Sequence, residues 1–259
     1  MRVSDVVGRR RIDLNVDIGE GFPFDADLLR FASSANVCCG AHAGSQEILE
    51  ETLALCRKAR VRIGAHPGYP DRLTMGRRSM ELGEQTVYLR SIFDQLQTFA
   101  KLEAFAYIKP HGAFYNDTAA VLPHDWNLPN PAKRQTPYEA GGHFLSLLPG
   151  GGSLGMLLRL YQVPLLGLAS TAHAVIAERA KVELISEGFA DRAMRPDGTL
   201  VPRGEPGAVL TDPNDIRQQV LRLAESVDSI CLHGDTPGCV EMAELVVSTL
   251  VDAGYEVAA

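Results

Sequence analysis

The sequence predicts an α/β protein with one domain, a seven-stranded parallel β/α barrel that spans residues 1–259. Short apolar or β-branched runs alternate with helical patterns, and nearly every run ends in polar residues. A length of 259 residues is usual for one such barrel and does not require a second domain. The seven expected strands lie at about residues 11–16, 35–39, 61–65, 105–109, 163–168, 182–186 and 229–232.

Helical segments separate several of these strands, and two of them are marked by their first residues. Ser45 is the expected N-cap of a helix with one apolar face. Asp212 followed by Pro213 is typical of an N-cap with proline at the first helical position. The expected helices lie at about residues 45–60, 84–102, 212–227 and 239–253.

The first strand carries polar residues at every second position. Asp13, Asn15 and Asp17 alternate with aliphatic residues, which places the polar set on one face of the strand. A polar face inside a barrel is costly unless its groups are paired. These side chains therefore either belong to a functional site or only satisfy neighbouring backbone groups and an arginine.

Polar residues follow six of the seven strands. Because the active site of a parallel barrel lies at the carboxyl ends of its strands, we expect residues far apart in the sequence to meet in one pocket. A doubly wound open sheet is the alternative, but there only the loops at the topological switch point would line a site. The strand-end residues are Asn15, Asp17, Glu20, His42, His66, Lys109, His111, Asp191, Arg192, His233 and Asp235.

Histidines recur at equivalent strand ends. His42, His66, His111 and His233 each lie within two residues of Gly or Pro, and imidazole either transfers protons near neutral pH or binds a metal. Nearby carboxylates such as Asp17 could complete a divalent-metal site. The chain contains no compact metal motif such as HExxH, so a bound metal stays open at this point.

Cationic residues at or near the strand ends are candidate anion binders. Lys109 is placed to neutralise an oxyanion, a carboxylate or a phosphoryl group. Arg192, Arg203 and the adjacent Arg77 and Arg78 could do the same, although paired arginines are equally common on a solvated surface.

A glycine-rich segment resembles a dinucleotide-binding fingerprint but lacks its context. Gly150, Gly152 and Gly155 fit G-x-G-x-x-G, yet the segment does not follow the first strand of the chain. The next acidic residue is Glu178, whereas the fingerprint needs one about 20 positions on. The segment is therefore interpreted as a flexible loop, and no Walker-type phosphate loop occurs in the sequence.

Composition and charge narrow the class of partner. A net charge of −7 gives no basic field for nucleic acid or anionic lipid, which favours a small-molecule ligand. No secretory core or run of about 18 apolar residues is present, so we expect a cytoplasmic protein that does not enter a membrane. The five cysteines form no CxxC pair and are expected to be reduced and buried, with Cys38 or Cys39 as a nucleophile the less favoured alternative.

Taken together, the strand-end blocks resemble the LamB/YcsF (lactam utilization) family in its own order, over essentially the whole chain. The resemblance implies a seven-stranded β/α barrel related to glycoside hydrolases and polysaccharide deacetylases. It also implies opening of 5-oxoproline to glutamate, with ATP and magnesium, by a protein that acts with two partners, the B and C subunits. The blocks that carry it are residues 13–20, 34–44, 63–71, 109–116, 189–192, 200–203, 206–208 and 231–235.

For such an activity we hypothesise the following roles for residues of this chain. Asp17 and Glu20 are expected to act as base and charge partner for water, and His42, His66 and His233 as proton carriers. Lys109 with Arg192 is expected to hold carboxylate or phosphoryl oxygens. The expected catalytic residues are Asp17, Glu20, His42, His66, Lys109, His111, Asp191, His233 and Asp235. The expected substrate-binding residues are Asn15, Asn36, Tyr115, Asn116, Arg192 and Arg203.

Some features depart from the family pattern. Residues 124–152 look like an insertion and contain the single tryptophan, Trp126, while Met194 and Ser45 replace a usual tyrosine and a usual acid. These changes concern substrate and partner binding more than the fold. Two alternatives remain, a metal-dependent carbohydrate deacetylase and a non-catalytic sugar- or lactam-binding protein, and the chain is also compatible with a homo-oligomer.

Overall fold

The strands form one parallel sheet. The computed structural model describes residues 10–79, 85–120, 150–195, 200–201 and 203–259. Its strands are β1 (Arg10–Ile18), β2 (Ser34–Cys38), β3 (Arg62–His66), β4 (Leu165–Gly167), β5 (Leu184–Phe189), β6 (Ser229–His233) and β7 (Tyr255–Val257). Every pairing between these strands is parallel, in the order β3-β2-β1-β6-β5-β4, with β7 also paired to β1. Within each half, β1 to β3 and β4 to β6, strands that are consecutive in the sequence are neighbours in the sheet, and the pairing of β1 with β6 joins the two halves.

This order confirms a parallel α/β architecture and does not fit the doubly wound sheet, whose two halves are wound in opposite directions. The described chain is a half-barrel, and the fully closed seven-stranded form is not established. The edges β3 and β4 are connected through the segment around Ile108, and Ile108 forms single parallel bridges to Ala65 and to Leu165.

The strand expected at about 105–109 is thus reduced to isolated bridges, and the seventh strand is instead β7, which the sequence analysis missed. The physical reason is the position of the prolines. Pro110 has no N–H with which to extend the pairing toward β4, and Pro67 has none with which to extend it on the side of β3.

The helices are α1 (Asp25–Leu28), α2 (Gln46–Ala59), α3 (Gln85–Leu102), α4 (Gly112–Ala120), α5 (Gly150–Tyr161), α6 (Ala172–Ala180), α7 (Pro213–Ala224) and α8 (Cys239–Asp252). Both expected N-caps are confirmed. The Ser45 hydroxyl accepts a hydrogen bond from the Ile48 N–H, and the Asp212 carboxylate accepts hydrogen bonds from the first turn of α7. The glycine-rich segment begins α5, so its interpretation as a loop was wrong. Residues 124–149 of the expected insertion lie outside the described residues.

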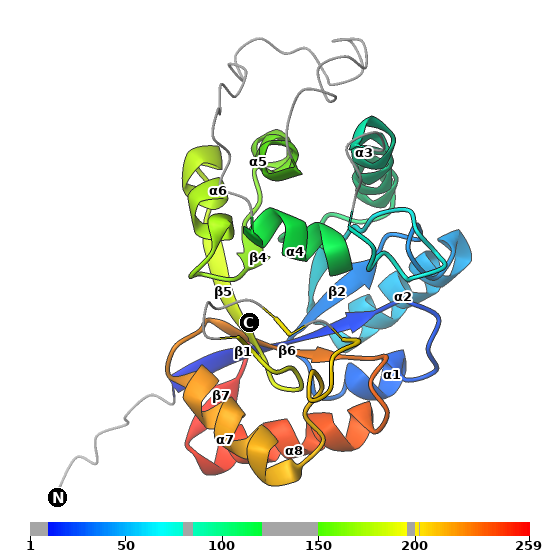
Figure 1. Cartoon of the computed structure of the whole chain (residues 1–259). Coiled ribbons are helices and arrows are strands. Elements are labelled where there is room, and N and C mark those ends of the chain that lie inside the picture. The colour runs from blue at the N-terminus through cyan, green and yellow to red at the C-terminus, as the bar shows by residue number, and fades with distance from the viewer. Residues whose placement is uncertain (1–9, 80–84, 121–149, 196–199, 202) are drawn as a thin grey trace, which may run out of the picture.

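The helices cover the outer face of the sheet. In Figure 1, α7 and α8 lie beside β6 and β7 at the bottom of the view, and α5 and α6 lie at the top near β4. Aliphatic residues of β1 such as Leu14 and Val16 pack into the main core on this side, and all five cysteines are buried and free.

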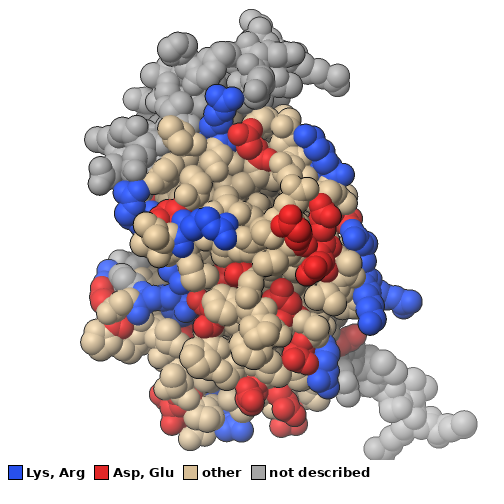
Figure 2. Space-filling model, turned by 90° about the vertical axis from the view of Figure 1, so that its right-hand side faces the viewer, with Lys and Arg blue, Asp and Glu red and all other residues tan. Residues whose placement is uncertain are grey.

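On the face seen in Figure 2, acidic and basic side chains are interspersed. In the described part of the chain, no helix is long and apolar enough to cross a membrane.

The inner face is polar near its carboxyl end and aromatic below it. Gly64 of β3 lacks a side chain where the ring of Tyr107 lies, since a Cβ there would be 2.1 Å from the ring Cε2. Tyr107 donates a hydrogen bond of 2.7 Å to Oδ1 of Asn36, the first of a series of polar side chains that leads upward to the strand ends. The fold therefore places a buried polar layer directly beneath the expected site.

Candidate active site

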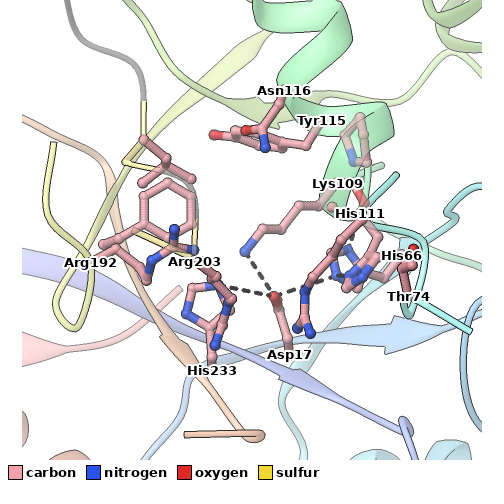
Figure 3. A pocket seen from close by; sticks show the side chains of 16 residues that line it. Asp17, His66, Thr74, Lys109, His111, Tyr115, Asn116, Arg192, Arg203 and His233 are labelled. Atoms are coloured by element: carbon pink, nitrogen blue, oxygen red, sulfur yellow. Dashed lines mark hydrogen bonds and ion pairs between the residues drawn. The ribbon is translucent and has the colours of Figure 1, made fainter. Parts of the chain in front are cut away.

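A cavity of about 410 Å³ lies at the carboxyl ends of the strands (Figure 3). Its floor is Asp17, with His66, His111 and Thr74 on one side and Arg192 and Arg203 on the other. The side chains and backbone that line it belong to Asp17, His66, Thr74, Arg77, Lys109, Pro110, His111, Gly112, Tyr115, Asn116, Phe189, Arg192, Leu200, Arg203, Gly204 and His233.

Asp17 is the centre of this floor. Its Oδ1 accepts hydrogen bonds from Asn36 Nδ2 at 2.7 Å and from Lys109 Nζ at 3.0 Å. Its Oδ2 lies 3.4 Å from His66 Nε2 and 3.8 Å from His233 Nε2. Burial raises the pKa of Asp17, but His66 and Lys109 outweigh burial and hold the pKa well below its usual range. Asp17 is therefore a carboxylate.

Lys109 is buried between two carboxylates. Its Nζ lies 3.0 Å from Asp17 Oδ1, 3.2 Å from Glu187 Oε2 and 2.9 Å from Cys231 Sγ. Burial lowers the pKa of Lys109, but these neighbours raise it well above its usual value, so the ammonium is retained. Burial raises the pKa of Glu187. The charge of Lys109 is thus already opposed by Asp17 and Glu187.

Glu187 was not among the expected site residues. The expected strand ended at residue 186, whereas β5 continues to Phe189. Because side chains alternate along a strand, the longer β5 turns Glu187 and Phe189 toward the same inner face. An acidic residue two positions before an aromatic one at a strand end was the available signal.

The nitrogens of His66 and His111 face each other. His66 Nδ1 lies 2.7 Å from the Lys109 carbonyl, and His111 Nε2 lies 2.9 Å from the Met75 carbonyl. A carbonyl only accepts, so each of these nitrogens carries a proton and donates it. In the neutral rings, the remaining nitrogens, His66 Nε2 and His111 Nδ1, then both carry lone pairs, yet they lie 2.9 Å apart. A shared proton or another cation is needed between them.

A proline creates this arrangement. In a continuous parallel ladder, the N–H of residue 67 would donate to the Lys109 carbonyl, but Pro67 has no N–H. The next bond of the ladder is present, from the His111 N–H to the Pro67 carbonyl at 2.8 Å. The Lys109 carbonyl is therefore available to His66, and the motif Ala-His-Pro fixes the orientation of its own histidine.

His42 and Glu20 lie behind His111 and do not line the cavity. The rings of His42 and His111 stack with centroids 3.8 Å apart, and Glu20 Oε1 lies 3.4 Å from His42 Nε2 and 3.3 Å from His111 Nδ1. Burial lowers the pKa of His42, but Cys38 and Glu20 raise it to about 9. Burial, with His42 and His66 nearby, lowers the pKa of His111 well below its usual value. His42 is thus the charged ring of this stack and His111 the neutral one.

His233 forms a dyad with Asp191. Its Nδ1 lies 2.9 and 3.0 Å from the two carboxylate oxygens of Asp191, which also accepts a hydrogen bond from Thr236. Burial raises the pKa of Asp191, but His233 lowers it below its usual value. An ionised Asp191 holds the proton of His233 on Nδ1, which leaves Nε2 directed toward Asp17.

Polar residues below the cavity hold Asp17 in place. Asn36 Nδ2 also donates to Asn15 Oδ1 at 2.6 Å, and Asn15 Nδ2 donates to Ser229 Oγ at 2.7 Å. Two of the three expected substrate-binding asparagines, Asn15 and Asn36, therefore lie beneath Asp17 and outside the cavity lining. Asp13 forms an ion pair with Arg62 at 3.3 Å, which agrees with the alternative that this carboxylate only pairs with an arginine.

The arginines that line the cavity differ in their hydrogen-bond and ion-pair partners. Arg192 donates from Nε to the Ala208 carbonyl at 3.2 Å and from Nη2 to the Val201 carbonyl at 2.5 Å. Arg203 is paired with Asp235, as is Arg77. Burial, and then Arg203, lower the pKa of Arg192 to about 10. Tyr115 and Asn116, both of α4, complete the wall of the cavity.

Within the described residues, three overlapping sets of side chains at this site could hold a metal. In each set the ligand atoms lie within 4.8 Å of one another, and the sets are Asp17 with His66 and His111, Glu20 with His42 and His111, and Asp17 with Cys231 and His233. The carbonyl contacts of His66 and His111 orient their free nitrogens, as the outer contacts of metal-bound histidines commonly do.

Comparisons with known proteins agree with the resemblance. A profile of the LamB/YcsF family matches residues 12–122 and 157–259. A protein of Haemophilus influenzae (strain PittGG), named as the A subunit of 5-oxoprolinase, is 36% identical over 259 residues, covering 93% of this chain and 96% of the relative. A protein of the same name from Pyrococcus horikoshii is 34% identical, covering 95% and 96%. The crystal structure of a lactam utilization protein from Thermus thermophilus has a TM-score of 0.73 at 27% identity, covering 96% of this chain and 99% of that one. The chain therefore belongs to the LamB/YcsF family.

Proposed function

We propose that this chain is the A subunit of an ATP-dependent 5-oxoprolinase, which opens the lactam ring of 5-oxoproline to give glutamate. The proposal further places the chain in an assembly with B and C subunits, in the cytoplasm. The names of relatives that are 34% and 36% identical over nearly the whole chain support the substrate and the subunit role.

The observation that carries the proposal is that the imidazoles of His66, His111 and His233 line one cavity with Asp17 as its floor. Opening a lactam needs a proton removed from water and a proton delivered to the ring nitrogen. His233 Nε2, with its ring held by Asp191, supplies a lone pair at the cavity. The proton shared between His66 and His111 supplies the acid.

The chemistry of an amide sets the order of the steps. The terminal phosphoryl group of ATP passes to the lactam oxygen, and water adds to the activated ring carbon as its proton goes to His233. The C–N bond then breaks as the hydroxyl that water left on the carbon releases its proton to solvent and becomes the acyl carbonyl. The nitrogen takes a proton from the pair of His66 and His111, and an acyl phosphate remains. A further water releases phosphate and leaves glutamate. Asp17 stabilises the positive charge that develops on the imidazoles.

The need for ATP explains why partner subunits are part of the proposal. The lactam of 5-oxoproline is an unstrained five-membered ring and a poor electrophile, so coupling to ATP is needed to open it. The sequence of this chain contains no Walker-type phosphate loop. We therefore assign much of the handling of ATP and magnesium to the partners.

The test measures glutamate and ADP released from 5-oxoproline and ATP. The chain is assayed alone and with B and C subunits from its own source, together with Asp17→Asn and His66→Gln. We expect release only from the complete mixture, and a loss of roughly 100-fold or more in both variants. Arg57→Gln, which alters an exposed ion pair with Glu103, is the control that retains activity. An inactive native mixture, or an unaffected Asp17→Asn, would contradict the proposal.

A second candidate is a metal-dependent amide hydrolase such as a carbohydrate deacetylase, favoured by the set Asp17, His66 and His111. These residues fit a divalent cation, because their free nitrogens and carboxylate converge with no proton of their own between them. A cation held there would polarise a substrate carbonyl. Metal content of the purified chain, before and after His111→Gln, measures this directly. Release of acetate from acetylated sugars without ATP would select this candidate over the first.

A further inference from the structure

Two arginines that line the cavity share one carboxylate. Arg77 Nη2 lies 2.5 Å from Asp235 Oδ2, and Arg203 Nη2 lies 2.9 Å from Asp235 Oδ1. Arg77 follows β3, Arg203 precedes α7, and Asp235 follows β6, so the carboxylate joins three separate segments. The arginine side chains are 30% and 22% exposed, compared with 8% for Asp235. Arg77 and Arg203, here called the arginine pair, therefore stand on the open side of the cavity.

Positive charge is in excess at this side. The arginine pair carries two charges and Asp235 opposes one of them. Arg192 adds a third guanidinium close enough for Arg203 to affect its pKa, which burial and this neighbour lower to about 10. Asp191, the other nearby carboxylate, is engaged by His233. Among the described residues, at least one positive charge at the cavity is left without a matching anion.

The other cations of the site are already committed. Lys109 is opposed by Asp17 and Glu187. Arg192 donates to two backbone carbonyls and so holds the segment that carries Arg203. The arginine pair, in contrast, uses one nitrogen of each guanidinium for Asp235, and a guanidinium has several N–H donors in a planar fork.

We propose that the arginine pair is the subsite for the carboxylate of the substrate, with Asp235 as the residue that positions both guanidiniums. The identity of the substrate rests on the proposed function. The carboxylate and the lactam carbonyl of 5-oxoproline lie on opposite sides of the ring nitrogen, and the cavity has the matching polarity. Its cationic side faces the carboxylate, and its floor of Asp17 and imidazoles faces the carbonyl.

The charge balance favours a carboxylate over a phosphoryl group. One carboxylate neutralises the single positive charge that Asp235 leaves on the arginine pair. A phosphate dianion would exceed that charge next to the carboxylate of Asp235, at a cost from like-charge repulsion. The arginine pair is thus a specificity element that distinguishes a lactam with a carboxylate from one without.

The experiment titrates four compounds calorimetrically into the full chain: 5-oxoproline, 2-pyrrolidinone (the same ring without the carboxylate), acetate and inorganic phosphate. The variants are Arg77→Gln and Arg203→Gln, with Arg57→Gln as the matched control arginine in an exposed ion pair. We expect the native chain and the control to bind 5-oxoproline roughly 30-fold more tightly than 2-pyrrolidinone, a ratio set by a charge-assisted pair. Both subsite variants should lose this preference while their binding of 2-pyrrolidinone is unchanged.

The outcomes separate the subsite from the proposed function. If 5-oxoproline keeps its preference in both variants, the subsite is wrong and the lactam assignment stands. If neither lactam binds the native chain, the lactam assignment fails, and acetate decides the subsite: binding that both variants lose supports it, and its absence overturns it. Phosphate bound more tightly than acetate through the arginine pair overturns the carboxylate assignment.

Discussion

The Nε2 atom of His66 lies 2.9 Å from the Nδ1 atom of His111, although the opposite nitrogen of each ring is committed as a donor to a backbone carbonyl. Two lone pairs at this distance repel, so the pair holds a proton or a metal cation in its working state. Either occupant makes the two rings act as one unit.

Replacing His66 tests that unit. His66→Gln removes the imidazole that lines the cavity, and we expect activity to fall roughly 100- to 10,000-fold, the range for loss of a general acid or base. His42→Gln is the matched comparison, because His42 lies behind His111 and outside the cavity lining, and it should cause a smaller loss. Thermal unfolding of both variants shows whether each is folded. Equal losses of activity in the two folded variants would contradict a special role for His66.

The charge triplet of Asp17, Lys109 and Glu187 gives a prediction about stability. Lys109→Met leaves two buried carboxylates without their cation and should lower the free energy of unfolding by roughly 3–5 kcal/mol. Adding Glu187→Gln removes one of those carboxylates and should recover part of the loss. Denaturant titration of the single and double variants measures this coupling.

A matched control separates burial from charge loss alone. Arg57→Met breaks an exposed ion pair with Glu103 and should cost less than about 1 kcal/mol. If Lys109→Met costs no more than this control, or if Glu187→Gln recovers nothing, the triplet is not the source of the stability.

Much of the fold could be predicted because its signals are local. The alternation in β1, the N-cap Ser45 and the Asp212-Pro213 pair each act within a few residues of the chain. The strand around Ile108 was overestimated because apolar content does not reveal that Pro67 and Pro110 on either side interrupt the pairing. β7 was missed because three residues are too few to establish a period.

For the candidate site, the sequence predicted which residues lie near one another but not which of their atoms make contact. The strand-end rule placed Asp17, His66 and His233 around one cavity, which the structure contains. It could not separate lining residues from supporting ones, so Glu20 and Asn15 were grouped with them. Which atoms meet depends on side-chain directions and on partners far away in the sequence. The carbonyl freed by Pro67 and the shared carboxylate of the arginine pair are both of this kind.

Gly64 gives a steric prediction for the inner face. A Cβ at this position would lie 2.1 Å from the ring of Tyr107, and the ring is fully buried, so Gly64→Ala must displace it. We expect a loss of roughly 1–3 kcal/mol in the free energy of unfolding, as for other overpacked cores. Gly204→Ala is the control, since no atom lies within 4 Å of its added Cβ. Denaturant midpoints that shift equally in the two variants would show that the Tyr107 contact is not responsible.

His173 is a neutral histidine outside the cavity lining. Its Nδ1 accepts a hydrogen bond from the Leu168 N–H at 3.2 Å, so its proton is on Nε2, which lies 3.0 Å from Thr118 Oγ1. Thr118 in turn donates to the Phe114 carbonyl at 2.6 Å. Burial lowers the pKa of His173 from 6.5 to about 3, and the ring packs edge-on against Tyr115 at 4.8 Å. The folded protein therefore keeps this ring uncharged and uses it to support a wall of the cavity.

The depressed pKa of His173 makes stability depend on pH with a definite sign. Between pH 6.5 and about 3, the unfolded chain binds a proton at this residue that the folded chain does not, so the free energy of unfolding falls as the pH is lowered through this window. At pH 5 the loss from this group should be about 2 kcal/mol relative to pH 7.5. His173→Gln cannot titrate, so it should be less stable at pH 7.5 but should lose about 2 kcal/mol less on acidification to pH 5. Denaturant titrations at the two pH values measure both quantities. If the free energy of unfolding falls by the same amount in the native chain and the variant between pH 7.5 and pH 5, His173 does not carry this acid sensitivity.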